Sequence, residues 1–152
     1  MMDILSDHEF STKPTSSEKS CMFLDGIQTH KNIAGICLEL CIRIDQKYLV
    51  FMTDDIPSED MLHIHLLDDD LNIIDSATIG GVYSTGSFGN YNLQEPDQIT
   101  FYFIGGNKWR VEILERKVFC LPFISSPKGV YRKKSFYQYF KLYGNAQPEV
   151  EG

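Results

Sequence analysis

The stretch GICLELCIRI, residues Gly35–Ile44, and the stretch YLVFMT, residues Tyr48–Thr53, decide the fold class of this chain. In the first stretch apolar and other side chains alternate, which predicts a β-strand with one buried face. In the second stretch apolar side chains fall on both faces, which is typical of a strand in the middle of a sheet. Asp45 and Gln46 separate the two stretches and predict a turn between antiparallel neighbours.

Other segments with a strand pattern follow on both sides of these two. They are Met22–Leu24, Met61–Leu67, Leu71–Ile79, Ile99–Ile104 and Trp109–Phe119. Six or seven strands joined by short turns predict a mainly β protein with an antiparallel meander. We expect a strongly curved sheet or an open barrel, and a sandwich or a sheet packed on a terminal helix remain as alternatives.

The two ends of the chain have weaker patterns. Residues 1–20 are rich in Ser, Thr and Lys and show little periodicity, so we expect a mobile N-terminal tail. Ser135 is a suitable N-cap and Gly144 a suitable C-terminal signal, which together predict a short C-terminal helix over Phe136–Tyr143. We therefore expect one β-rich domain over residues 21–145 and a frayed tail over residues 146–152.

The charge is unevenly distributed along the chain. The 152 residues fit one domain and carry a net charge of −7. Residues 1–75 hold fifteen Asp and Glu against five Lys and Arg, a net charge of −10, whereas residues 76–152 have a net charge of +3. Such a split predicts distinct electrostatic surfaces if the fold keeps the halves apart. A protein of this acidity is a poor general binder of nucleic acid, because the phosphate backbone repels it.

We expect a cytoplasmic protein that does not bind membranes. No segment has the roughly 20 apolar residues of a membrane span, and the N-terminus lacks a basic region followed by an apolar one. We therefore expect free thiols at the four cysteines, Cys21, Cys37, Cys41 and Cys120. Cys37 and Cys41 would share one face of a strand at a distance of roughly 13 Å, which is too far for a disulfide.

Acidic residues gather in two loops that flank the Met61–Leu67 segment. We predict that these residues bind a basic partner: Asp54, Asp55, Glu59, Asp60, Asp68, Asp69 and Asp70. Carboxylates gathered on one surface attract a positively charged protein and speed its association. A solvated acidic surface that only keeps the protein soluble is the alternative.

Two other groups of residues suggest binding chemistry. His63 and His65 lie two positions apart on a predicted strand and, with a carboxylate from Asp68–Asp70, could hold a metal ion. We favour two polar side chains on a solvated face and expect no metal or cofactor.

Basic and aromatic residues interleave near the C-terminus, a pattern found in single-strand nucleic-acid binders. They are Lys128, Tyr131, Arg132, Lys133, Lys134, Phe136, Tyr137 and Tyr139. We favour the alternative in which the aromatics pack the terminal helix on the sheet.

We find no local signature of a catalytic Ser/His/Asp or Cys/His arrangement and expect no enzyme activity and no small-molecule substrate.

With its strand-rich segments Gly35–Leu71 and Ile99–Phe119 and its acidic loops, the chain resembles the immunity proteins of bacterial polymorphic toxin systems, especially those of contact-dependent growth inhibition. The resemblance implies a tight complex with one cognate toxin domain. Toxins of these systems are often nucleases with basic clefts, which an acidic surface could block. A nucleic-acid-binding barrel and a barrel that binds a small ligand or metal remain as alternatives.

Overall fold

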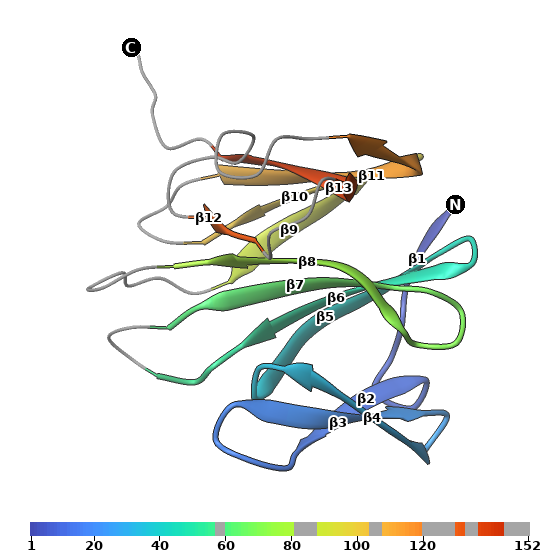
Figure 1. Ribbon diagram of the computed structural model, residues 1–152, viewed down its shortest axis with the longest axis vertical. Coiled ribbons are helices and arrows are strands. Elements are labelled where there is room, and N and C mark those ends of the chain that lie inside the picture. The colour runs from blue at the N-terminus through green and yellow to red at the C-terminus, as the bar shows by residue number, and fades with distance from the viewer. Residues whose placement is uncertain (57–59, 81–87, 104–107, 120–129, 133–136, 145–152) are drawn as a thin grey trace.

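The computed structural model of the protein describes residues 1–56, 60–80, 88–103, 108–119, 130–132 and 137–144 (Figure 1). All regular structure in these residues is β-strand, and every paired neighbour runs antiparallel. The prediction of a mainly β, antiparallel protein is therefore confirmed. No helix in the described residues is long and apolar enough to cross a membrane.

The strands divide among three sheets, none of which is a closed barrel in the described residues. The central sheet has, in spatial order, β1 (Met2–Ile4), β5 (Cys37–Ile44), β6 (Lys47–Thr53), β7 (Leu62–Leu67), β8 (Ile73–Ile79) and β12 (Val130–Tyr131). The C-terminal sheet has β13 (Tyr137–Gly144), β11 (Lys108–Phe119), β10 (Gln98–Tyr102) and β9 (Gly89–Gln94). The N-terminal sheet has β2 (Phe10–Pro14), β3 (Lys19–Leu24) and β4 (Ile27–Ala34). This arrangement replaces the single curved sheet or open barrel that the sequence favoured.

The three sheets are stacked in layers, with the central sheet in the middle (Figure 1). The core between the central and C-terminal sheets includes Phe51, whose ring meets the edge of Phe101 at 5.3 Å between centroids. The core between the central and N-terminal sheets includes Met52, together with Phe10 and Met22. Successive residues of β6 thus enter different cores, which explains why its sequence is apolar on both faces.

A shift of register in β5 changes the predicted faces of that strand. Leu38 pairs with Met52 and Leu40 pairs with Phe51, so the strand contains one extra residue between them, Glu39. Cys37 and Cys41 consequently lie on opposite faces of the sheet, and the prediction that they share a face is wrong. Cys21, Cys37 and Cys41 are free thiols as expected, whereas Cys120 lies outside the described residues.

The first twenty residues do not form the expected unstructured tail. β1 and β2 lie in this segment, and Met2 and Phe10 are buried in the two cores. β4, for which the sequence pattern predicted no strand, completes the N-terminal sheet. These strands are short or exposed along one face, so they leave little alternation in the sequence. The frayed tail predicted for residues 146–152 lies outside the described residues.

The predicted C-terminal helix is a β-strand in the structure. β13 pairs with β11 over nearly its whole length, and Phe140 and Leu142 point into the core. Exposed and buried residues alternate along β13, because a strand turns successive side chains to opposite faces. Phe136, the first residue of the predicted helix, lies outside the described residues.

Candidate functional site

The loop between β6 and β7 brings several of the predicted partner-binding residues together. The backbone N–H of Asp54 donates a hydrogen bond to Asp60 Oδ1 at 2.8 Å, which ties the two ends of the loop. Asp55 lies next to Asp54 with a positive φ of 60°, a conformation that Asp tolerates better than most residues. Glu59 lies outside the described residues.

Glu39, the extra residue of β5, adds a fourth carboxylate at the same end of the central sheet. Its Oε2 accepts a hydrogen bond from Thr53 Oγ1 at 2.7 Å. Burial raises the pKa of the neighbouring Cys37 thiol, and the carboxylates of Asp55, Glu39 and Asp60 raise it further. A thiol in this environment is a poor nucleophile, because the reactive form is the thiolate. We call Glu39, Asp54, Asp55 and Asp60 the acidic end.

The turn Asp68–Asp70 stands at the other end of β7, which is six residues or about 20 Å long. Asp68 Oδ1 accepts hydrogen bonds from the backbone N–H groups of Asp70 and Asn72, each at 2.9 Å. These bonds, chiefly those from Asn72, lower the pKa of the Asp68 carboxyl group. The Asp68 carboxylate therefore serves to hold its own turn.

Basic side chains from other strands meet this turn. Arg43 Nη2 on β5 lies 2.6 Å from Asp69 Oδ1, and the Arg43 guanidinium group also stacks on the Tyr48 ring. Lys31 on β4 donates to the carbonyl oxygen of Asp70. The structure thus separates the predicted acidic surface into two regions, and cations partly neutralise the Asp68–Asp70 region.

His63 and His65 lie on the face of β7 that the N-terminal sheet covers. Their rings are nearly parallel, with centroids 6.2 Å apart. His65 is only 4% exposed, so the prediction of a solvated face is wrong for this residue. The sequence pattern could not reveal this burial, since β2 comes from the expected tail and β4 from residues without a strand pattern.

Each histidine has a full set of hydrogen-bond partners. His65 Nε2 donates to the carbonyl oxygen of Ala34 at 3.0 Å, and Ser76 Oγ lies 2.8 Å from its Nδ1. Burial lowers the pKa of His65 to about 4, so the ring is neutral at physiological pH. His63 Nε2 lies 2.7 Å from Asp54 Oδ1. The Asp54–His63 contact ties the acidic end to β7.

The carboxylate next to these histidines comes from Asp54 and not from the Asp68–Asp70 turn that we considered as a third metal ligand. Within the part of the chain that the structure describes, no three His, Cys, Asp or Glu side chains gather in a way that could hold a metal ion.

The basic and aromatic segment near the C-terminus is only partly described. Lys128, Lys133, Lys134 and Phe136 lie outside the described residues. Arg132 does not face solvent, because its Nη2 lies 2.6 Å from Asp75 Oδ2 and its guanidinium group stacks on Phe140. Its charge is therefore used inside the fold and is not available to a phosphate backbone.

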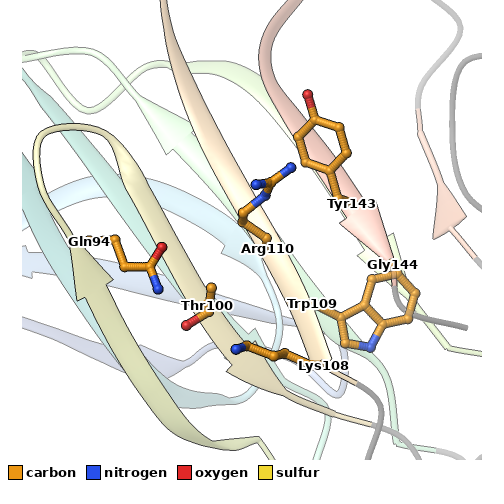
Figure 2. A pocket seen from close by; sticks show the side chains of 7 residues that line it. All are labelled: Gln94, Thr100, Lys108, Trp109, Arg110, Tyr143 and Gly144. Atoms are coloured by element: carbon orange, nitrogen blue, oxygen red, sulfur yellow. The ribbon is translucent and has the colours of Figure 1, made fainter. Parts of the chain in front are cut away.

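The outer face of the C-terminal sheet carries an open pocket of about 380 Å³ (Figure 2). It is lined by Gln94, Thr100, Lys108, Trp109, Arg110, Tyr143 and Gly144. No local pattern in the sequence points to this region. Polar residues alternate with apolar ones along β10 and β11, but only the pairing of β9, β10, β11 and β13 brings them together.

Comparisons with protein-family models, with curated proteins and with solved structures found no match to this chain.

Proposed function

We propose that this chain is a non-catalytic, cytoplasmic immunity protein that binds a basic cognate toxin domain, such as a nuclease, and neutralises it through its acidic end. The observation that supports the proposal is that hydrogen bonds hold the β6–β7 loop of the acidic end in one conformation. Asp54 bonds both Asp60 and His63, at 2.8 Å and 2.7 Å, so the carboxylates are held in place before a partner arrives. A preorganised surface loses less conformational entropy on binding than a mobile one.

The uneven charge of the chain is also consistent with this function. The strands of the C-terminal sheet hold more basic than acidic residues, with Lys108, Arg110, Arg116, Lys117 and Lys141 against Glu112 and Glu115. The acidic end lies on the central sheet, in the half of the chain with the net negative charge. A molecule with separated charges orients a basic partner as it approaches and so speeds productive encounter.

The Asp68–Asp70 turn plays a smaller part in this proposal. Asp68 and Asp69 are engaged with Asn72 and Arg43, which leaves the exposed carboxylate of Asp70 as the group that a partner can reach most easily. A partner that covers both regions would span the length of β7, about 20 Å, which is within the reach of an ordinary protein interface.

The proposal can be tested by affinity capture with the tagged chain from its native host, followed by an activity assay of the captured protein. We expect a basic protein in equimolar amount whose toxic activity the chain inhibits. Asp55→Asn and Asp70→Asn together should slow association several-fold at low salt. Asn keeps the positive φ at position 55 accessible. Glu18→Gln with Glu115→Gln is the control, because it removes the same charge from exposed sites elsewhere.

Two results would count against this function. The first is recovery of nucleic acid or a small ligand with no basic protein. The second is an equal change of association rate in the control pair, since net charge alone would then explain the attraction.

A further inference from the structure

We propose that the open pocket on the outer face of the C-terminal sheet binds the phosphate group of a small polar molecule, with Lys108 and Arg110 as its cationic ligands. This site lies on a different sheet from the acidic end. It goes beyond the proposed function, and either proposal can fail while the other holds.

The register of the sheet places the polar groups of the pocket side by side. Thr100 pairs with Arg110, and Arg110 pairs with Tyr143, so the three form one row across β10, β11 and β13. Lys108 is two residues from Arg110 on the same face of β11, about 7 Å along the strand. Figure 2 shows Gln94 and Thr100 on the side of the pocket opposite Tyr143.

Arg110 is oriented but keeps its hydrogen-bonding groups. Its guanidinium carbon lies 4.2 Å from the centre of the Tyr143 ring. The Tyr143 hydroxyl donates to Glu112 Oε1 at 3.2 Å, which turns that carboxylate toward Tyr143. Within the described residues, no hydrogen bond or ion pair engages the guanidinium group of Arg110 or the ammonium group of Lys108. Both are therefore able to donate to a ligand.

The wall of the pocket at the end of β13 depends on a glycine. A Cβ atom at Gly144 would lie 2.5 Å from Trp109 Cζ3, so the indole ring occupies the space that a side chain would need. The Trp109 Nε1–H donates to the carbonyl oxygen of Phe103 at 3.0 Å, which holds the ring in this position. Trp109 is only 3% exposed, so the ring supports the wall of the pocket and offers little surface of its own to a ligand.

The chemistry of the lining selects the class of ligand. Two cationic side chains on the same face of β11, at positions about 7 Å apart along the strand, match the double charge and several oxygen atoms of a phosphate better than a single carboxylate. The amide of Gln94 and the hydroxyl of Thr100 can hydrogen-bond to a polar carrier. The volume of about 380 Å³ is at the small end of ligand sites, which suits a sugar phosphate or a nucleoside monophosphate.

The net charge of the molecule opposes the binding of anions. With −7 overall, the protein repels anions at long range, so binding of a phosphate compound requires a local site. The strands of the C-terminal sheet are basic overall, so the test has to separate this site from a general attraction of anions to the sheet.

The experiment uses the full chain with inorganic phosphate, with two matched pairs of compounds, glucose 6-phosphate against glucose and AMP against adenosine, and with a short single-stranded oligonucleotide. Thermal shift and calorimetric titration should show saturable binding of a phosphorylated compound at millimolar concentration and none of its neutral partner. Arg110→Gln and Lys108→Gln should each weaken this binding by about tenfold or more. Both positions face solvent, and the melting temperature without ligand checks that the variants fold.

Lys141→Gln is the control, since Lys141 lies exposed on the same sheet outside the pocket lining. It should leave the affinity unchanged within about twofold. The proposal is overturned if no phosphorylated compound binds, if Lys141→Gln weakens binding as much as Arg110→Gln, or if only an oligonucleotide binds. The last result would make the surface a nucleic-acid interface.

Discussion

The carboxylate of Asp75 on β8 lies 2.6 Å from the guanidinium group of Arg132, which follows β12 in the same sheet, and both partners also bond β13 of the C-terminal sheet. Asp75 Oδ2 also accepts the backbone N–H of Tyr139 on β13 at 2.7 Å. Arg132 in turn donates to the carbonyl oxygen of Phe140 at 3.2 Å. The side chains of the pair are only 12% and 9% exposed, so water screens their attraction little.

Asp75→Ala should be strongly destabilising, because it leaves the Arg132 charge buried without a partner and the Tyr139 N–H without its acceptor. We expect the free energy of unfolding to fall by about 3 to 5 kcal/mol. Urea denaturation of the variant and the parent measures the change. The double variant Asp75→Asn with Arg132→Met removes both charges and should recover part of the loss. If Asp75→Ala lowers the free energy of unfolding by no more than an ordinary surface substitution does, the pair does not hold the sheets together.

Asp69→Asn removes the ion pair between Arg43 and Asp69 and should lower the free energy of unfolding much less than Asp75→Ala does. The Asp69 side chain is 57% exposed, and water and salt screen its attraction to Arg43. We expect a change in the free energy of unfolding of about 1 kcal/mol or less, which high salt reduces further. Urea denaturation at low and high salt measures both quantities. A loss as large as that of Asp75→Ala would mean that this turn is a main support of the fold.

Gly35→Ala should destabilise the protein much more than Gly26→Ala. Both glycines have a positive φ, 116° and 80°, so each substitution strains the backbone by about 1 to 2 kcal/mol. A Cβ atom at Gly35 would also lie 2.3 Å from Met52 Cβ, whereas nothing lies within 4 Å at Gly26. Thermal or urea unfolding of the two variants separates the clash from the strain. Equal losses would show that the junction of β4 and β5 can move to accept a side chain.

β6 and β7 of the central sheet could be predicted from the sequence because both of their faces are buried. Tyr48–Thr53 is apolar throughout, and Leu62, Ile64 and Leu66 alternate with the histidines. The N-terminal sheet could not be predicted in this way. β4 is largely exposed, so its sequence IQTHKNIA has neither an apolar run nor clear alternation.

The C-terminal strand shows a conflict between local signals and tertiary pairing. Ser135 and Gly144 resemble helix caps, but Gln138, Phe140 and Leu142 repeat every second residue and are buried. That period of two was present in the sequence and outweighs the caps once β11 supplies a hydrogen-bonded partner.

The candidate sites were predictable to different degrees. The acidic residues of the β6–β7 loop are adjacent in the sequence, so their proximity could be foreseen. Glu39 joins them only because of the register shift in β5, which no local pattern indicates. The pocket of Lys108 and Arg110 requires the register of four strands, which depends on contacts between distant residues.

The buried ring of His65 makes stability depend on pH in a defined range. Burial lowers its pKa in the folded protein to about 4, from 6.5 in an unfolded chain. Between these values the unfolded chain binds a proton that the folded protein does not, so stability falls as the pH falls from 6.5 toward 4. The total loss from this group is about 3 kcal/mol, and it does not grow further below the lower value.

His65→Gln should flatten this part of the stability profile, because Gln does not titrate and can still donate to the carbonyl oxygen of Ala34. Urea midpoints measured at intervals across the range give the slope for each variant. His8→Gln is the control, since it makes the same substitution at an exposed histidine. Carboxylates that titrate near the lower limit affect parent and variants alike, so the difference between slopes isolates His65. If His65→Gln keeps the slope of the parent, the ring is not held neutral by the N-terminal sheet, and the packing of that sheet on β7 is looser than the hydrogen bond to Ala34 implies.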